Sequence, residues 1–350
     1  MPPESRPRVW AILGPHRGDN NQVLALAQAL GFRFEEKKLT YNWRRRIPTG
    51  WLGATFASVD AHSRPQLEGE PPNLTISTGL RSVPVVRELM RRSGGRMRSV
   101  HLGFPRVSPR YFDLVVPTPE YPVPDGANVL RIPFALTPHA STEVDRSDRD
   151  LLAAYPRPHR LLLIGGPTLY WRLPGQEIAR SVNKLLHSAE QDGGSVLAVG
   201  SPRTPIDLLG TVRETLEASS VPFMFEPGDG PPSYPALIES ADQIFVTADS
   251  VAMVADAVMT GKPVGIIPIR KSFAGEVAMG AMDRLRPRQR LYPRDLRFFW
   301  KAIQENGFGG TIESPKASNP PDYAKMVADR VRQLLEQPVP PATGDPDNGR

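Results

Sequence analysis

The sequence predicts an α/β protein with two doubly wound, Rossmann-like parallel-sheet domains and an interdomain cleft. Short apolar runs that end in glycine alternate with amphipathic stretches along most of the 350 residues, which is typical of parallel strands joined by helices. A polar, proline-rich stretch at residues 137–158 interrupts this alternation once. A chain of this length usually forms two domains.

In the first half, the run at 9–14 predicts a buried strand, and a helix follows with apolar residues at helical spacing and a stop at Gly31. A second helix is expected from Ser82 to about Arg92, with Pro84 in its first turn. Further strands are expected at 32–39, 73–77, 98–103 and 112–116.

The alternation restarts after the polar stretch. Strands are expected at 160–164, 195–199, 244–247 and 263–268, and helices at 178–189, after the Thr204-Pro205 cap, at 250–260 and at 323–335. The expected domains are 1–145, a linker at 146–158, 159–318, a C-terminal helix at 319–337 that packs back on the first domain, and a disordered tail at 338–350.

Composition excludes several classes of protein. The absence of cysteine excludes a disulfide scaffold, cysteine-ligated zinc, iron–sulfur clusters and thiol catalysis. GxxxxGK[ST] and GxGxxG motifs are absent, which argues against P-loop enzymes and dehydrogenases, and the six histidines lack metal-ligand spacing. We therefore expect no metal and no cofactor. The chain has no long apolar run and no signal peptide, so we expect a cytoplasmic protein.

Positive charge is concentrated in the first half. Residues 1–150 contain 21 Lys and Arg against 15 Asp and Glu, which accounts for the whole net charge of +6. Nucleic acid, anionic lipid and phosphorylated ligands are candidate partners, and a solvated arginine-rich surface is the structural alternative.

The stretch 244–268 carries the clearest local signal of a binding site. A strand runs into Asp249-Ser250, which can cap a helix, and Asp249, Met253, Asp256 and Thr260 then share one helix face. The helix N-terminus suits an anion, and an acid one or two turns further suits a ribose diol. An ordinary capped helix with one solvated aspartate explains the same pattern.

Two more loops follow strands of the second domain. Gly165-Gly166-Pro167-Thr168 would let backbone amides approach a phosphate, although a plain tight turn fits equally. Ser201-Pro202-Arg203-Thr204 follows the next strand, so Arg203 would reach the same anion. Asp148 and Asp150 resemble a metal-binding DxD motif, but they lie in the polar linker and we treat them as chance.

In the first domain, the loop Gly14–Asn20 brings together an imidazole, a guanidinium and a carboxylate, from His16, Arg17 and Asp19. His16 or Asp19 would serve as a general base, and exposed loop side chains are the alternative. The loop 77–81, which contains Gly79, is a comparable strand–helix connection.

Arginine and large apolar residues are mixed at 43–56. This segment contains Trp43, Arg44, Arg45, Arg46, Trp51, Leu52 and Phe56. Arginine with tryptophan is typical of proteins that bind an anionic membrane surface. A core segment flanked by solvated arginines is the alternative. The basic run 284–297 is either a solvated surface or a wall for acidic ligands.

These motifs resemble the mitochondrial-fission ELM-type family, which comprises a plant elongated-mitochondria factor and bacterial homologues. The resemblance runs through residues 8–335 in family order. Its motifs are 18–22, 72–79, 100–106, 112–117, 163–166, 201–205, 246–254 and 260–264, and the stretch 246–264 is the most specific. The family is similar to GT-B glycosyltransferases, in which the C-terminal domain binds the nucleotide-sugar and the N-terminal domain binds the acceptor.

The resemblance implies roles for individual residues. The nucleotide-sugar would be bound by Gly165, Gly166, Thr168, Ser201, Arg203, Thr204, Asp249, Ser250, Met253 and Asp256, with Asp256 on the ribose. The acceptor side would comprise Gly14, Arg17, Gly18, Gln22 and Gly79. Two positions depart from the family pattern, since Asp256 replaces a glutamate and Pro202 replaces an arginine.

Together these observations predict a glycosyltransferase that moves a sugar from a nucleoside-diphosphate-sugar to a lipid-linked or lipopolysaccharide-type acceptor. Helix N-termini, Arg203 and Lys271 would stabilise the leaving diphosphate without a metal. The composition is typical of a bacterial chain, and the protein would attach peripherally to the inner membrane at its cytoplasmic face, without nucleic acid. The alternative is a GT-B-shaped adaptor without catalysis that recruits a membrane-remodelling or envelope partner.

Overall fold

A computed structural model describes residues 7–137, 144–226, 230, 232–285 and 294–338. The chain divides into two compact units, which we describe separately. Unit 1 comprises Met1–His139 and Asp322–Arg350, and unit 2 comprises Ala140–Pro321. The tail expected to be disordered, apart from Pro338, lies outside the described residues. No helix in the described ranges has the length and apolar character needed to cross a membrane.

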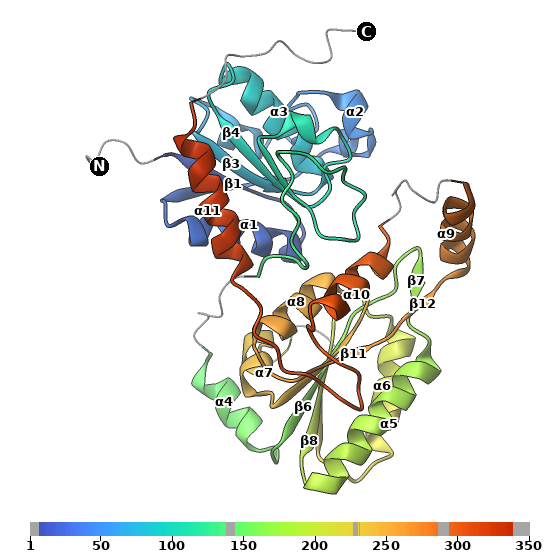
Figure 1. Cartoon of the computed structure of the whole chain (residues 1–350). Helices are drawn as coiled ribbons and strands as arrows, with labels where there is room; N and C mark the ends of the chain where they lie inside the picture. Colours follow the sequence, from blue (N-terminus) through green and yellow to red (C-terminus); the bar gives the residue numbers. More distant parts are fainter. Residues whose placement is uncertain (1–6, 138–143, 227–229, 231, 286–293, 339–350) are drawn as a thin grey trace. The chain divides into compact units, whose positions relative to one another are not determined.

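Unit 1 contains a five-stranded parallel sheet in the order β2-β1-β3-β4-β5 (Figure 1). Its strands are β1 (Val9–Leu13), β2 (Phe34–Lys38), β3 (Leu74–Thr78), β4 (Arg98–Leu102) and β5 (Leu114–Val116). Its helices are α1 (Arg17–Leu30), α2 (Thr49–Leu52), α3 (Val83–Arg92) and α11 (Tyr323–Glu336). Short 3₁₀ helices are η2 (Trp43–Arg46), η3 (Arg64–Leu67), η4 (Leu80–Ser82) and η5 (Pro109–Tyr111).

Alternation along β1 separates the two cores of unit 1. Val9, Ala11 and Leu13 belong to the core that contains the apolar faces of α1 and α11. Trp10 and Ile12 belong to the core on the opposite face, under α3. Successive side chains of a strand point to opposite faces, so the fully apolar sequence of β1 reflects a sheet covered by helices on both sides.

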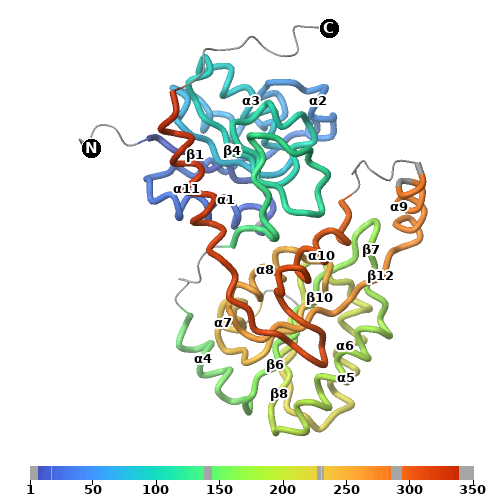
Figure 2. Tube along the Cα trace, viewed as in Figure 1, coloured from blue at the N-terminus to red at the C-terminus, as the bar shows by residue number. Residues whose placement is uncertain are grey.

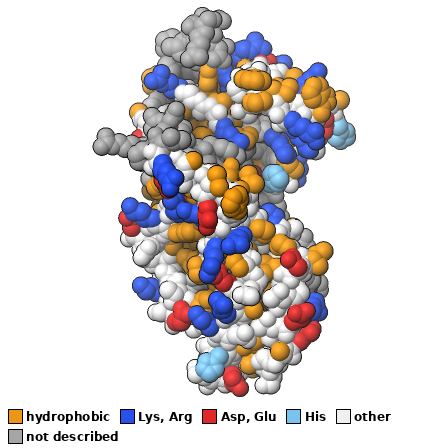
Figure 3. Space-filling model, turned by 90° about the vertical axis from the view of Figure 1, so that its right-hand side faces the viewer, with side chains coloured by type: hydrophobic (Ala, Val, Ile, Leu, Met, Phe, Trp, Pro, Cys, Tyr) orange, Lys and Arg blue, Asp and Glu red, His pale blue; other side chains and the backbone are white. Residues whose placement is uncertain are grey.

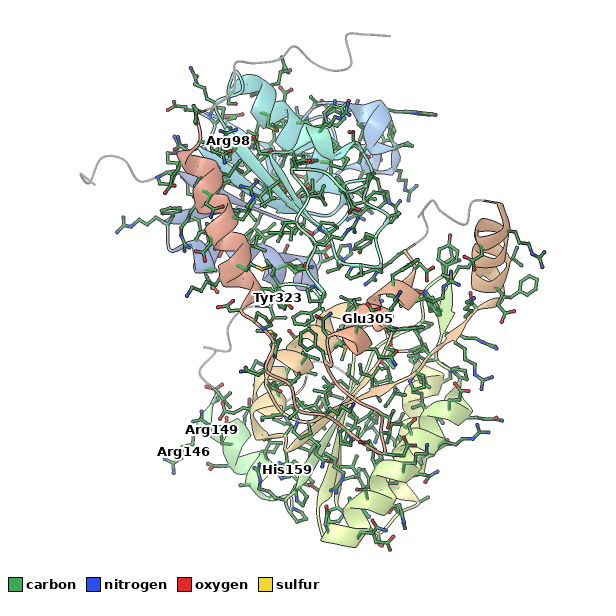
Figure 4. All side chains as sticks on the ribbon, viewed as in Figure 1. Arg98, Arg146, Arg149, His159, Glu305 and Tyr323 are labelled. Atoms are coloured by element: carbon green, nitrogen blue, oxygen red, sulfur yellow. The ribbon has the colours of Figure 1, made fainter. Side chains whose placement is uncertain are left out.

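The helix α11 returns to unit 1 and packs along α1 (Figure 2). Its apolar residues, Val327 and Val331 among them, join the same core as Leu26 and Leu30. The Arg332 guanidinium also donates to the carbonyls of Ala29 and Leu30, 2.6 and 3.2 Å away, at the C-terminal end of α1. Tyr323, at the start of α11, packs edge-on against Phe134, with ring centroids 5.2 Å apart (Figure 4).

Unit 2 contains a second five-stranded parallel sheet, in the order β11-β10-β6-β8-β9. The strands are β6 (His159–Ile164), β8 (Ser195–Gly200), β9 (Phe223–Glu226), β10 (Gln243–Thr247) and β11 (Val264–Ile267), with a small antiparallel pair of β7 (Trp171–Arg172) and β12 (Arg270–Lys271). The helices are α4 (Arg146–Ala153), α5 (Gly175–Asp192), α6 (Ile206–Glu217), α7 (Tyr234–Ser240), α8 (Val251–Met259), α9 (Phe273–Leu285) and α10 (Leu296–Glu305).

Helices cover both faces of the second sheet as well. α5 and α6 form one core with alternate residues of β6 and β8. α7 and α8 contact β6, β10 and β11, and Figure 1 shows them across the sheet from α5 and α6. The predicted fold class, two doubly wound parallel sheets, is confirmed by these two units.

Residues 146–158 differ from the expected linker, because they contain the helix α4. The Asp148 carboxylate is buried and accepts a hydrogen bond of 3.0 Å from the backbone N–H of Ser233, just before α7. Arg146 and Arg149 extend from the exposed side of α4 (Figure 4). This segment is polar in composition, yet Asp148 and Leu152 give it one buried side.

Three predicted helix caps are wrong in detail. Thr204 does not cap α6, because Pro205 occupies the N-cap position and the Thr204 hydroxyl bonds elsewhere. Ser250 is the N-cap residue of α8, but its side chain makes no capping hydrogen bond. The Ser82 hydroxyl likewise donates backwards, to the carbonyls of Thr78 and Gly79.

Candidate functional site

Three loops meet at the carboxyl edge of the sheet in unit 2. They follow β6, β8 and β10, which are neighbours in the sheet. The loops hold Gly165-Gly166, Ser201–Thr204 and Asp249-Ser250. This is the edge at which open α/β sheets bind ligands, and the three loops that sequence analysis singled out are joined there by direct hydrogen bonds.

Asp249 connects the β10 loop to the β6 loop. Its Oδ2 accepts a 2.8 Å hydrogen bond from the Gly166 N–H, and the Thr247 hydroxyl accepts one of 2.8 Å from the Gly165 N–H. A side chain at Gly165 would overlap the Asp249 carboxylate, and one at Gly166 would overlap the backbone carbonyl of Arg203. Glycine is therefore required at both positions by close packing.

These bonds correct the predicted role of the two glycines. Their amides were expected to approach a phosphate, but both amides already donate to side chains of the protein. The glycines instead allow Asp249 and Arg203 to pack against the β6 loop. Thr168 was also expected to bind the nucleotide-sugar. Its N–H donates instead to the carbonyl of Trp171 across a turn.

Thr204 holds the β8 loop against β6. Its hydroxyl points to the carbonyls of Ile164 and Gly165, 2.9 and 2.7 Å away, and its oxygen accepts from the Ser201 N–H at 2.8 Å. The Ser201 hydroxyl in turn accepts from the Arg203 N–H at 3.3 Å. The loop is thus closed by its own side chains, which fixes where Arg203 leaves the backbone.

Arg203 is the cation of this site. Its Nη2 lies 3.8 Å from Asp249 Oδ2, while about half of its side chain remains exposed. The Asp249 side chain is fully buried, and burial raises the pKa of its carboxyl. Asp249 Oδ1 has no hydrogen-bond partner among the described residues. An exposed guanidinium near the N-terminal end of α8 forms an environment that suits an anion.

Asp256 lies further along α8, where the Tyr234 hydroxyl donates a 3.1 Å hydrogen bond to its Oδ2. Removal from water raises the pKa of the Asp256 carboxyl to about 6. Asp249 and Asp256 therefore have separate partners in the structure, on the β6 loop and on α7 respectively. Met253, on the same helix, is partly buried.

Three aromatic residues near the site, Trp171, Tyr234 and Trp300, had no predicted role. The Trp300 Nε1 donates a 2.9 Å hydrogen bond to the carbonyl of Ala248, the residue before Asp249. The Trp171 ring packs edge-on against Trp300, with centroids 4.7 Å apart. Tyr234, the first residue of α7, was missed because the sequence before this helix is rich in proline and glycine and shows no periodicity. Trp300 lies on a helix that periodicity alone would have identified, since α10 is strongly amphipathic.

Lys271 was expected to assist the leaving group. It lies on β12, which pairs with β7, and its side chain is partly buried. The preceding Arg270 forms an ion pair with Glu177. The basic run 284–297 falls mostly on residues 286–293, outside the described part of the chain.

In unit 1, the loop after β1 is closed by Asn20. Its side chain accepts from the Gly14 N–H at 2.8 Å and donates to the Gly14 carbonyl at 2.9 Å. His16 occupies the N-cap position of α1, and Asp19 lies in the first turn. Asp19 Oδ2 lies beside Gly79, at the end of β3. The structure thus brings Asp19, Gly14 and Gly79 to the carboxyl edge of this sheet.

The remaining predicted acceptor residues lie on α1. Gly18 is exposed and Gln22 is partly buried, while the side chain of Arg17 is outside the described set. In the described parts of the chain, His, Asp and Glu side chains form no cluster of three or more that could hold a metal ion.

The predicted membrane segment is partly corrected. Phe56, expected beside the tryptophans, is buried in the core of unit 1, with the Arg92 guanidinium 4.4 Å from its ring centre. Leu52 is only partly exposed. Trp43 and Trp51 are strongly exposed, and Arg44, Arg45 and Arg46 are exposed between them.

Comparison with known proteins places these features in a family. The sequence model of the family described as mitochondrial fission ELM1 matches residues 17–335. The mitochondrial fission protein ELM1 of Arabidopsis thaliana is 25% identical over 242 residues, which are 62% of this chain and 56% of the plant protein. The chain therefore matches little more than half of the length of that curated relative.

Solved structures resemble most of the chain. The UDP-GlcNAc 2-epimerase of Methanocaldococcus jannaschii is 12% identical with a TM-score of 0.53, and the match covers 94% of this chain and all of the epimerase. MurG of Acinetobacter baumannii is 12% identical with a TM-score of 0.45, over 94% of this chain and 92% of MurG. At such identity the likeness to the epimerase indicates a shared fold, the two-domain architecture of GT-B type.

Proposed function

This chain belongs to the mitochondrial fission ELM1 family, and from that premise we propose that it is a glycosyltransferase that uses a nucleoside-diphosphate-sugar as donor. One observation carries the proposal. Three strand-end loops of unit 2 are hydrogen-bonded to one another and present Arg203 near the N-terminal end of α8. The fold shared with an epimerase of UDP-GlcNAc supports a nucleotide-sugar as the ligand of this edge.

The first amides of α8 and the Arg203 guanidinium would hold the diphosphate. The first N–H groups of a helix have no partner within the helix, and its dipole favours negative charge there. As the bond from the sugar to the diphosphate breaks, negative charge grows on the leaving oxygen. Donors fixed in advance by Thr204 and Asp249 would stabilise that charge without reorganising. No metal ion is required for this chemistry, and Lys271 is a second candidate cation.

Asp256 would accept hydrogen bonds from the ribose hydroxyls of the donor. Its Oδ2 is engaged by Tyr234, which leaves Oδ1 to accept from a ligand. Tyr234 would orient the carboxylate, so we add this residue to the proposed donor site. Met253, one turn before Asp256, would line the same face of α8.

Unit 1 would bind the acceptor at the loop after β1. His16 or Asp19 would remove the proton from the acceptor hydroxyl, with Gly14 and Gly79 allowing close approach of the chain. We propose a lipid-linked or lipopolysaccharide-type acceptor in a bacterial envelope, met at the cytoplasmic face of the inner membrane.

Calorimetric titration with UDP, UDP-GlcNAc and uridine tests the donor site. We expect Asp256→Ala to weaken all three ligands by about 1–3 kcal/mol, because each contains the ribose. Arg203→Ala should weaken UDP and UDP-GlcNAc but leave uridine unchanged. Arg180→Ala, an exposed arginine on α5, is the matched control. Equal affinities in wild type and both site variants would remove these residues from the site.

A second function, that of an adaptor without catalysis, is favoured by the similarity to a mitochondrial fission protein of a plant. The two functions differ in a simple measurement. An adaptor of this kind needs no donor, so the wild-type protein would show no heat with any nucleotide or nucleotide-sugar at millimolar concentration. Binding without turnover, over a panel of acceptors, would also favour the adaptor.

A further inference from the structure

Two tryptophans on unit 1 are exposed to an unusual degree. Trp51 is 85% exposed and Trp43 is 68% exposed, whereas Trp10 of the same unit is fully buried. A tryptophan side chain carries roughly 150–250 Å² of surface, and an apolar patch of this kind on a soluble protein usually marks an interaction site. We call the exposed side chains of Trp43, Arg44, Arg45, Arg46 and Trp51 the tryptophan–arginine surface.

The backbone under this surface is fixed to the body of unit 1. The Asn42 side chain accepts from the Arg44 N–H at 2.9 Å and donates to the carbonyls of Ala57 and Val59, 2.8 and 3.2 Å away. The Asn42 N–H also donates to the carbonyl of Ser58. Trp43 therefore projects from a short helix whose base is held in place, and α2, which carries Trp51, packs against α3.

The charge of the surface has one sign. Arg44, Arg45 and Arg46 form no ion pair with any residue that the structure describes, and no acidic residue lies between Glu36 and Asp60. The Arg44 guanidinium lies 5.4 Å from the centre of the Trp43 ring, a cation–π arrangement that leaves its donors available. Figure 3 shows the side of the molecule on which α2 lies, with hydrophobic and basic side chains next to one another on its surface.

From this juxtaposition we infer that unit 1 docks on an anionic lipid bilayer through the tryptophan–arginine surface. Tryptophan is enriched where a bilayer meets water, because its ring prefers the headgroup region. Arginines beside it would bind the lipid phosphates, which act on the protein within a Debye length. The inference goes beyond glycosyl transfer, since the surface would dock whether or not unit 2 binds a donor.

A second exposed apolar patch, on α9 of unit 2, serves as a comparison for the tryptophan–arginine surface. On α9, Phe273 is 83% exposed and Val277 is 58% exposed. Glu276 is exposed too and precedes Val277 directly in the sequence, so this apolar pair has an acidic neighbour where Trp43 has arginines. It offers a matched control of similar apolar size.

Sedimentation of the full chain with vesicles tests the inference. Vesicles of neutral phosphatidylcholine, alone or with about 30 mol% of anionic phosphatidylglycerol, are compared at low and high salt. We expect wild type to pellet with the anionic vesicles at low salt and to be released at high salt. Arg44→Ser/Arg45→Ser/Arg46→Ser should reduce the partition coefficient roughly 10²-fold.

Trp43→Ser/Trp51→Ser should also remain in the supernatant, while Phe273→Ser/Val277→Ser should pellet like wild type. Circular dichroism establishes that each variant is folded. A blue shift of tryptophan emission on vesicle binding, lost in the Trp43/Trp51 variant, would report ring insertion. The inference is overturned if wild type stays in solution, if both surface variants pellet equally well, or if the arginines instead bind single-stranded RNA while vesicles are ignored.

Discussion

The Asp256 carboxylate should cost the protein stability at neutral pH. Its pKa rises from the ordinary value of 3.8 to about 6 because folding removes it from water. Between these two values the native state binds more protons than the unfolded state. The free energy of unfolding therefore falls as pH increases from about 4 to 6 and is then constant with respect to this group.

The magnitude follows from the shift. About two pKa units correspond to about 3 kcal/mol at 1.36 kcal/mol per unit. Asp256→Asn keeps the shape and the hydrogen bond from Tyr234 but removes the charge. Since the bond to a neutral amide is weaker and the side chain is partly exposed, we expect the variant to be more stable than wild type by about 1–3 kcal/mol at pH 7.5. At pH 4 the difference should fall below about 1 kcal/mol.

Native-state hydrogen exchange measures the stability difference for unit 2 alone, because peptides from β10 and α8 report the opening free energy of this unit. Glu190→Gln, which removes an exposed carboxylate from α5, is the matched control and should change stability little at either pH. The reasoning fails if Asp256→Asn is no more stable than wild type at pH 7.5, or if its advantage is the same at pH 4. The same variant should bind UDP more weakly, in which case the carboxylate is retained for binding at a cost in stability.

Four other substitutions test the site and the fold. His16→Ala or Asp19→Asn should lower turnover roughly 10²–10⁴-fold with unchanged donor affinity, and full activity in both would exclude a base in this loop. Gly165→Ala should displace Asp249 and lower both stability and UDP affinity by calorimetry, because the new methyl group would overlap the carboxylate. Arg332→Ala should destabilise unit 1 by about 1–3 kcal/mol in urea unfolding, since two carbonyls of α1 lose a charged donor; an unchanged midpoint would contradict this.

Strands with strong apolar character could be predicted from the sequence. β1 is apolar throughout, and β6, β8 and β10 are apolar in their central residues, since helices cover both faces of each sheet. Each of these strands ends close to a glycine or a polar loop. Elements in which apolar residues are less clearly separated from polar residues were not predicted. β9 contains the sequence FMFE at the edge of its sheet, and α4 is a polar helix with only two buried residues.

The site could be predicted as a location but not as a set of contacts. Parallel topology places the loops after β6, β8 and β10 at one edge, so their meeting followed from the order of elements. Which atom bonds to which depends on side-chain directions that spacing does not specify. The two glycines suggested backbone N–H groups available to a ligand, yet these N–H groups donate to the side chains of Thr247 and Asp249. The role of Tyr234 depends on where α7 packs, which no local pattern indicates.

The return of α11 to unit 1 has a consequence for synthesis on the ribosome. Unit 2 is inserted between the two segments of unit 1, so its residues are complete before α11 emerges. Until then a nascent chain exposes the stripe on α1 that includes Leu26 and Leu30, which Val327 and Val331 later cover. Unit 2 can therefore fold first, although it begins later, and unit 1 acquires α11 only after all of unit 2 has been synthesised. A chain cut before Asp322 would keep that apolar stripe open to aggregation and to chaperones.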